Sequence, residues 1–106
     1  MSKMQVRFSF DDELMKEKGV NREDIYYTLK KNFTAKGLIC VSDSEILTFE
    51  NAGNENDYGN MWAIILALVE CDWFVGCVSS CAFVENGKCE DILSQIPEMK
   101  RIMETA

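Results

Sequence analysis

Residues 61–84, MWAIILALVECDWFVGCVSSCAFV, form the most apolar stretch of the chain and decide how it folds. Only Glu70, Asp72 and two serines interrupt it, so we expect the stretch to lie inside the protein. Its longest uninterrupted apolar run, Met61 to Val69, has nine residues, whereas a membrane-spanning helix needs about 20. The stretch therefore predicts a buried core segment and no contact with a membrane.

The first half of this stretch has helical spacing. The apolar side chains recur every three or four positions, at Met61, Ile64, Ile65, Leu68 and Val69. Asn56 or Asp57 is a suitable N-cap, so the pattern predicts a helix from about Asp57 to Glu70. Ala63 and Ala67 give this helix a small-residue face that another backbone could approach closely.

The second half, Trp73 to Val84, is rich in Val, Phe, Trp and Cys and lacks Leu, Glu, Lys and Arg. This composition predicts a strand that is covered on most of both faces. Alternation would place Trp73, Val75, Cys77, Cys81 and Phe83 on one face and Phe74, Val78, Ala82 and Val84 on the other. The second apolar face then needs a cover, either the C-terminal helix or a second copy of the chain, and homodimerisation is expected on this ground.

The N-terminal part contains clear signals for where its strand and helix begin and end. Met4, Val6, Phe8 and Phe10 alternate with polar residues and predict a strand. The charged segment 11–18 predicts a loop or a single helical turn in which Leu14 and Met15 touch the core. Asn21 as a cap, with Ile25, Leu29 and Phe33 as an inward stripe and Gly37 as a stop, predicts a helix from about Arg22 to Lys36.

The remaining segments are shorter. Leu38 to Val41 and Ile46 to Phe49 predict a hairpin with a polar connection, and residues 85–88, which contain Asn-Gly, predict a turn. Cys89 to Ile96 predicts a short amphipathic helix that Pro97 stops or kinks, and Met99, Ile102 and Met103 suit a further turn. This apolar C-terminal edge either covers the sheet or meets a second subunit.

These elements follow the order strand, helix, strand, strand, helix, strand and terminal helix. The order predicts an α+β fold of the ferredoxin-like split βαβ type (βαββαβ), with two helices on one face of an antiparallel sheet. At 106 residues the chain should form a single globular domain, residues 1–106. The N-terminal segment MSKMQVRF has no hydrophobic signal region, so we expect a cytoplasmic protein.

Charge is distributed unevenly. Residues 1–39 carry eight Lys/Arg and six Asp/Glu, a balance of +2, whereas residues 40–99 carry one Lys and eleven acids, a balance of −10. A negative field of this kind repels phosphate backbones, so direct nucleic-acid binding is not expected. The acidic half is either a solvated surface or a docking face for a basic protein partner.

The chain contains no histidine and five cysteines. Without histidine the usual general base, the Ser-His and Cys-His nucleophile pairs and all histidine metal sites are excluded. An odd number of cysteines without an export signal indicates buried, reduced thiols. The spacing Cys71-x5-Cys77-x3-Cys81-x7-Cys89 lacks a Cys-x2-Cys pair, so we expect no metal and no cofactor.

A few residues are candidates for contact or for a pocket. Asn54, Glu55 and Asp57 belong to the polar loop 51–60, NAGNENDYGN, at the entrance to the apolar helix. Tyr58, Trp62 and Trp73 are aromatic side chains that either line a pocket or belong to the core. Glu70 and Asp72 flank the junction between the predicted helix and strand, where they are either half-buried acids or surface caps.

Two hypotheses of function follow. The first is a non-catalytic, acidic protein-interaction module that docks a basic partner surface and forms a homodimer. The second is a small ligand-binding domain, or a histidine-free enzyme, with a pocket between the sheet and the 51–60 loop. No residue is assigned a catalytic role.

Overall fold

A five-stranded antiparallel sheet forms one layer of the protein. The computed structural model describes residues 3–98 and residue 101. The strands are β1 (Met4–Phe10), β2 (Ile39–Asp43), β3 (Leu47–Glu50), β4 (Val78–Glu85) and β5 (Lys88–Asp91), in the spatial order β2-β3-β1-β4-β5. The central strand β1 pairs with β3 on one side and with β4 on the other, and all pairs are antiparallel.

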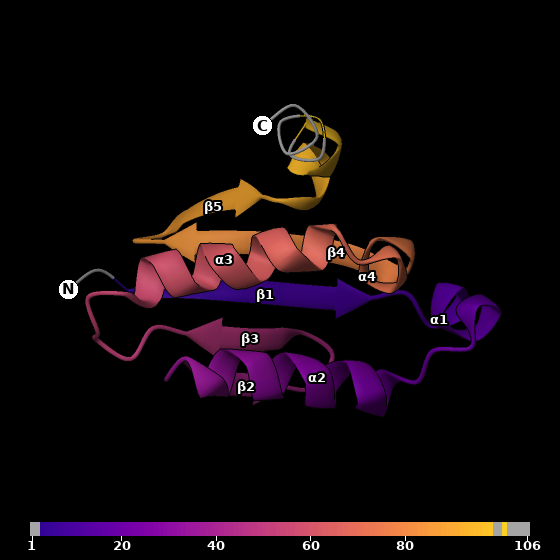
Figure 1. Ribbon diagram of the computed structural model, residues 1–106, viewed down its shortest axis with the longest axis horizontal. Coiled ribbons are helices and arrows are strands. Elements are labelled where there is room, and N and C mark those ends of the chain that lie inside the picture. Colours follow the sequence, from indigo (N-terminus) through magenta and orange to yellow (C-terminus); the bar gives the residue numbers. More distant parts are fainter. Residues whose placement is uncertain (1–2, 99–100, 102–106) are drawn as a thin grey trace.

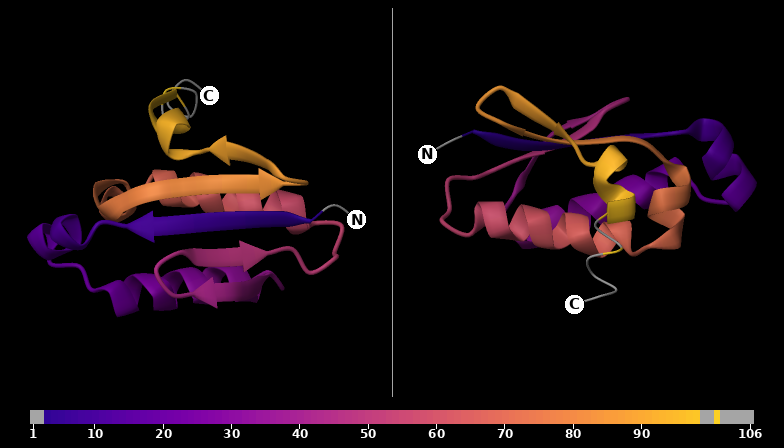
Figure 2. Two further views of the ribbon diagram at one scale, coloured as in Figure 1. Left: turned by 180° about the vertical axis from the view of Figure 1, so that it is seen from behind. Right: turned by 90° about the horizontal axis from the view of Figure 1, so that it is seen from above.

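Helices cover one face of this sheet. The two long helices, α2 (Arg22–Ala35) and α3 (Asp57–Val69), run across the same face (Figures 1 and 2). Two short helices, α1 (Asp12–Lys18) and α4 (Asp72–Cys77), pack against each other at the end of the sheet where β1 finishes and β4 begins. The fold is therefore α+β with two layers.

The core lies between the sheet and the helices and is rich in aromatic rings. The predicted alternation of β1 is confirmed, because Met4, Val6, Phe8 and Phe10 are all buried. Phe8 contacts the rings of Phe33 and Phe49, among others. Burial of large side chains of this kind contributes roughly 1.5–3 kcal/mol each, and it fixes the layers relative to one another.

The predicted helix start at Asn21 is confirmed. Its side chain accepts a hydrogen bond from the Glu23 N–H, which satisfies one free donor of the first turn of α2. The prediction for residues 11–18 was too short, because Asp11 caps the two-turn helix α1. Met15 is buried as expected, but Leu14 is 36% exposed.

The prediction of a strand from Trp73 was wrong for its first five residues. Trp73 to Cys77 belong to α4, and the strand begins at Val78. Phe74 explains the difference: it is fully buried and makes edge-to-face contacts with Phe8 and Phe10. Packing of this ring overrides the β preference of Trp, Phe and Val, which depends strongly on context.

The face assignment drawn from a strand of 73–84 is wrong as well. Phe74 and Val78, which were expected on the second sheet face, are buried in the core with Cys81 and Phe83. The second face carries Ala82 and Val84, and β1 places Arg7 and Gln5 directly beside them. This face is half-polar. Shielding by the C-terminal helix or by a second copy of the chain is therefore less necessary than the sequence suggested.

The predicted helix at Cys89 to Ile96 was also wrong in its first half. Residues 88–91 form the strand β5, which pairs with β4 across a two-residue turn. Asn86 and Gly87 both have positive φ, of 51° and 83°, as a type I′ hairpin turn requires. The Asn-Gly pair that predicted only a turn is thus a hairpin signal.

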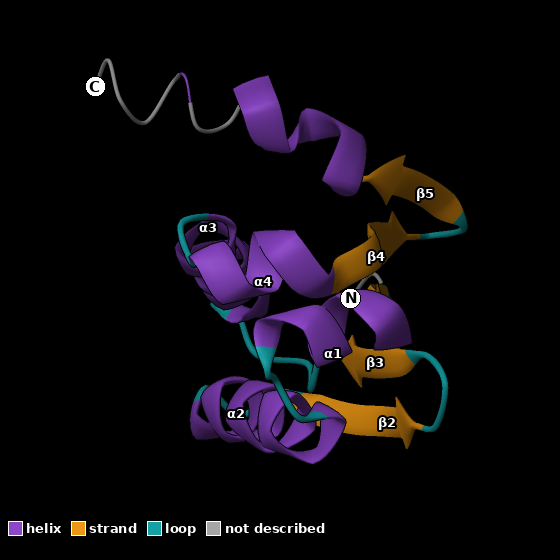
Figure 3. Cartoon of the chain, turned by 90° about the vertical axis from the view of Figure 1, so that its right-hand side faces the viewer, coloured by secondary structure: helices purple, strands orange, loops and turns teal. Residues whose placement is uncertain are grey.

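The chain after β5 turns back toward the helices. It forms a short 3-10 helix, η1 (Leu93–Gln95), and residues 96–98 continue helically, so Pro97 does not stop the segment. Ile92 and Ile96 are buried, and the Ile92 N–H donates to the Cys81 carbonyl. Figure 3 shows the segment on the helix side of the sheet, not across its open face. Met99, Ile102 and Met103 lie outside the described residues.

The element order thus differs from the predicted βαββαβ arrangement. A fifth strand extends the sheet beyond β4, and the short helices α1 and α4 interrupt the connections. Within residues 3–98 and 101, no helix is both long enough and apolar enough to cross a membrane.

Candidate functional site: an aromatic and acidic recess

A recess of 360 Å³ opens between the first turns of α3 and the β4-β5 hairpin. We call it the aromatic–acidic recess. Seven residues line it: Tyr58, Trp62, Phe83, Glu85, Lys88, Cys89 and Glu90. Three of them are aromatic and two are acidic.

The 51–60 loop positions the helical side of the recess. Asp57 is fully buried, and its Oδ2 accepts hydrogen bonds from the backbone N–H groups of Ala52 (2.7 Å) and Asn54 (3.0 Å). Asn51 exchanges backbone and side-chain hydrogen bonds with Met4 at the start of β1. The loop is therefore fastened to the sheet, and this fixes where α3 begins.

Helical periodicity then brings two aromatic residues to one side of α3. Tyr58 and Trp62 are four residues apart, which places them on the same face of a helix, and their ring centroids lie 6.5 Å apart. Phe83 on β4 completes the set, with its ring 5.8 Å from Tyr58 and 5.2 Å from Trp62. Phe83 is only 5% exposed and forms the floor, whereas Tyr58 is 52% exposed and forms a wall.

The register of the β4-β5 hairpin places three charged side chains at the recess. Phe83 lies opposite Glu90, and Glu85 lies opposite Lys88, in the β4-β5 pairing. Residues directly opposite in an antiparallel pair share a face, and residues 83 and 85 share a face because a strand alternates. Both carboxylates and the ammonium group therefore belong on the same side of the hairpin as Phe83.

These charges are not paired with one another. Among the described residues, no ion pair joins Lys88 to Glu85 or Glu90. The indole N–H of Trp62 is also buried without an acceptor in the described part of the chain. A buried donor without an acceptor costs roughly 1–3 kcal/mol.

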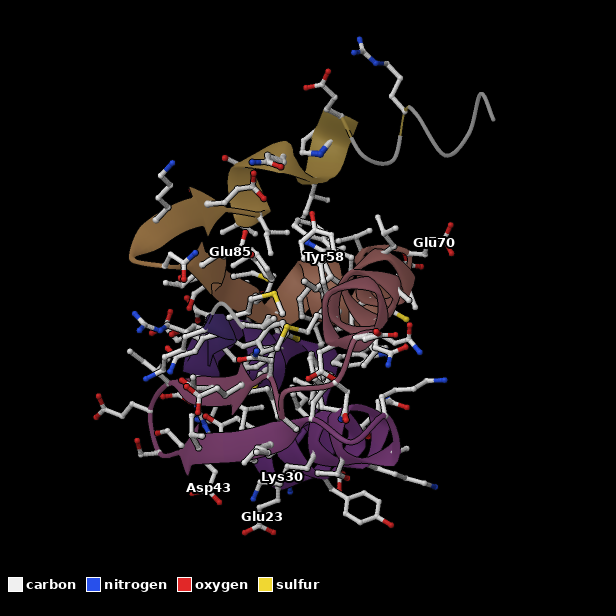
Figure 4. The ribbon with its side chains drawn as sticks, turned by 90° about the vertical axis from the view of Figure 1, so that its left-hand side faces the viewer. Glu23, Lys30, Asp43, Tyr58, Glu70 and Glu85 are labelled. Atoms are coloured by element: carbon white, nitrogen blue, oxygen red, sulfur yellow. The ribbon has the colours of Figure 1, made fainter. Side chains whose placement is uncertain are left out.

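A larger hollow of 690 Å³ lies on the other side of the molecule, between α2 and the β2-β3 hairpin. We call it the tyrosine groove, and it is lined by Arg22, Glu23, Tyr26, Tyr27, Lys30, Asp43, Ser44 and Glu45. Figure 4 shows Lys30, Asp43 and Glu23 together, well away from Tyr58 and Glu85.

The polar groups of the tyrosine groove are paired internally. Arg22 donates to Asp12, to the Tyr26 hydroxyl and to the Phe10 carbonyl, and the Tyr26 hydroxyl donates to the Ser44 carbonyl. Lys30 donates to Asp43 over 2.6 Å. These hydrogen bonds raise the pKa of Arg22 and of Lys30 and lower the pKa of Asp43.

The structure separates the residues proposed from sequence. Tyr58 and Trp62 line the recess, and Asp57 anchors the loop before it. Asn54 and Glu55 are exposed and do not line it.

The other three candidates lie elsewhere. Glu70 and Asp72 are exposed, so the surface alternative is correct for both and no half-buried acid lies at that junction. Trp73 lines a different, apolar hollow of 360 Å³ between α2 and α3, beside Ala63 and Ala67. The small-residue face of α3 thus borders an open hollow.

Sequence reasoning missed five of the seven residues that line the recess. Phe83, Glu85, Lys88, Cys89 and Glu90 were not proposed, because residues 89–96 were expected to be helical and no β-hairpin was expected after Val84. The signal was present in Asn86-Gly87, which predicts a hairpin and hence which residues face each other. The predicted pocket between the sheet and the 51–60 loop is displaced: the first turns of α3 and the β4-β5 hairpin line the recess.

Five free thiols are distributed between the core and the surface. Cys77 and Cys81 are buried as expected, and burial, followed by the charge of Asp91, raises the pKa of Cys81 to about 12. Cys40 and Cys71 are half-buried, whereas Cys89 is exposed at the recess and contradicts the expectation of buried thiols. Over the described ranges, no group of three or more metal-ligating side chains is present.

Comparison of the chain with protein-family models, with curated proteins and with solved structures gave no match. A function for this chain is therefore inferred from the site itself.

Proposed function

We propose that this protein is a non-catalytic interaction module that docks a basic segment of a partner protein in the aromatic–acidic recess. The observation that carries the proposal is the contact of three aromatic rings beside two carboxylates that are not ion-paired with Lys88. Aromatic faces attract cations through their quadrupole, and carboxylates attract them through charge. The −10 balance of residues 40–99 adds a long-range attraction for basic partners.

The tyrosine groove is a weaker candidate although it is larger. Arg22 and Lys30 already have carboxylate partners there, so an incoming anion or cation would have to break ion pairs before it gained new ones.

The proposal is tested by titrating a Lys/Arg-rich peptide and an Asp/Glu-rich peptide of equal length into the isotope-labelled protein. We expect the basic peptide to shift the NMR signals of Tyr58, the Trp62 indole and Glu90, with an affinity that falls as salt rises. The acidic peptide should shift nothing. The Trp73 indole is an internal control because it lies in a different hollow.

A basic peptide that shifts no signal, or that shifts only signals of the tyrosine groove, would overturn the proposal. A bound peptide should also slow alkylation of Cys89, which is exposed at the recess, relative to Cys71. Unchanged alkylation of Cys89 at saturating peptide would argue against the recess as the docking site.

A second candidate function is a small domain that binds a cationic metabolite. The volume of the recess, 360 Å³, favours it, because small-molecule pockets are commonly about 300–1,000 Å³. A thermal-shift screen with quaternary ammonium and guanidinium compounds tests it, and stabilisation by these compounds but not by basic peptides would favour it over the first.

Two finer proposals concern the fold and the assembly. We propose that β1 to β4 with α2 and α3 form a split βαβ core of the ferredoxin-like kind to which β5 is added; the position of β1 between β3 and β4 supports this. We also propose homodimerisation through the open sheet face, supported by the exposed Ile39, Val41 and Ile46. A monomeric mass in dilute solution would remove the dimer proposal.

A further inference from the structure

We propose that the recess recognises an arginine side chain of the docked segment, in preference to lysine. This inference rests on the proposed function and specifies which cation the partner presents. It depends on the shape of the aromatic surface, on the placement of the two carboxylates and on Lys88.

The aromatic surface suits a planar cation. Phe83 forms a buried floor and Tyr58 an exposed wall, and their rings stand at 84° to each other. The Trp62 ring is inclined at 41° to Phe83. A guanidinium group is planar and weakly hydrated, so it stacks on such a ring face, whereas a lysine ammonium is a compact and strongly hydrated point charge.

The carboxylates suit a forked donor. Glu85 and Glu90 share the face of Phe83, on neighbouring strands of the hairpin. An arginine has five N–H donors in a fixed plane and can bond one carboxylate through two of them while its face contacts a ring. A lysine cannot make the stacking contact and the two-point contact together.

Lys88 provides a further test of the proposal. It lines the same recess and carries a positive charge, opposite to that of the carboxylates. A docking cation is repelled by Lys88, which faces Glu85 across the hairpin. Neutralising Lys88 should therefore strengthen binding of the arginine segment, although the substitution also removes a lysine side chain that lines the recess. A recess that simply collected apolar side chains would not respond in this way.

The experiment compares four peptides that are identical, with basic flanking residues, except at one central position. That position holds arginine, lysine, trimethyllysine or citrulline, which has nearly the shape of arginine without its charge. Calorimetry with the full chain should show the arginine peptide binding roughly tenfold more tightly than the lysine peptide. The citrulline peptide should fall to or below the level of the lysine peptide.

Variants of the recess test the named residues. Glu90→Gln should weaken the arginine peptide several-fold, and Lys88→Gln should strengthen it. Glu55→Gln is the matched control, because it removes one exposed negative charge outside the recess. Tyr58→Ala should reduce the preference for arginine over lysine. Tyr58 is half-exposed, so the variant should fold, and its thermal unfolding midpoint verifies this.

The outcomes separate this inference from the proposed function. If no peptide binds, both are wrong. If lysine or trimethyllysine binds as tightly as arginine, docking of a basic segment stands and the arginine assignment is overturned. If Lys88→Gln weakens binding, or Glu55→Gln acts as strongly as Glu90→Gln, the recess is not the arginine site.

Discussion

The aromatic–acidic recess and the tyrosine groove are built from the same kinds of side chain but differ in how their polar groups are partnered. In the groove Arg22 bonds Asp12 and Lys30 bonds Asp43, and the Tyr26 hydroxyl both accepts and donates a hydrogen bond. In the recess Glu85 and Glu90 form no ion pair with Lys88 in the described part of the chain. The polar groups of the groove therefore hold elements of the fold together, and they are not left available for a ligand.

The comparison teaches that volume alone does not identify a binding site. The groove has 690 Å³ and the recess 360 Å³, yet the smaller hollow retains carboxylates outside ion pairs and an indole N–H without a described acceptor. Substitutions in the groove should change stability and leave binding alone, whereas substitutions of recess side chains should do the opposite. The support of the recess, at Asp57, should affect both.

The largest effect is expected at Asp57. Asp57→Ala removes the acceptor of the Ala52 and Asn54 N–H groups, so it should lower the free energy of unfolding by about 1–3 kcal/mol. The loop would also loosen before Tyr58, and affinity for the basic peptide should fall. Chemical denaturation and the peptide titration measure the two effects.

Asp57→Asn is the matched control, because it keeps a carbonyl oxygen that can accept from the same two donors. It should be less destabilising than Asp57→Ala. Equal loss from both variants would show that the negative charge at the start of α3, not the two hydrogen bonds, is what stabilises this region.

A smaller effect is expected from a matched pair of tyrosine substitutions. Tyr26→Phe removes a hydroxyl that accepts from Arg22 and donates to the Ser44 carbonyl, and should cost roughly 0.5–1.5 kcal/mol of unfolding free energy. Tyr58→Phe removes a hydroxyl from a side chain that is 52% exposed, and should leave stability nearly unchanged. Equal losses in the two denaturation curves would contradict the contrast between groove and recess.

The smallest effect concerns single carboxylates and pH. Lys30 lowers the pKa of Asp43 from its ordinary value of 3.8, so the stabilisation is present above that value and is lost as pH falls through the lowered pKa. Asp43→Asn should lower the thermal midpoint slightly at neutral pH and match the parent protein in strong acid. Glu90→Gln should not lower it at neutral pH. A midpoint for Asp43→Asn that stays below the parent value at all pH values would exclude the ion pair as the cause.

Most elements could be predicted where local chemistry and burial agree. The alternation of Phe8 and its neighbours, and the cap at Asn21, work through residues close in sequence, so the pattern alone identifies β1 and α2. Trp73 to Cys77 could not be assigned in this way, because their helix depends on the packing of Phe74 against Phe8 and Phe10. Those partners are more than sixty residues away in the chain.

The same distinction between local pattern and tertiary packing applies to the candidate site. Tyr58 and Trp62 share a helical face that periodicity reveals, whereas Phe83 and Glu90 join them only through the β4-β5 register and the packing of α3 on the sheet. The sequence supported Glu70, Asp72 and Trp73 as site residues equally well, but the fold places them away from the recess.

The sequence by itself determined the composition of the core, the class of fold, the main helix boundaries and the chemistry that the absence of histidine excludes. Only the tertiary structure decided which charges are paired, which aromatic rings meet and where the apolar stretch changes from helix to strand. The physical reason is that ion pairs and ring contacts join side chains from different elements, and their geometry is set by packing between layers, not by neighbours along the chain.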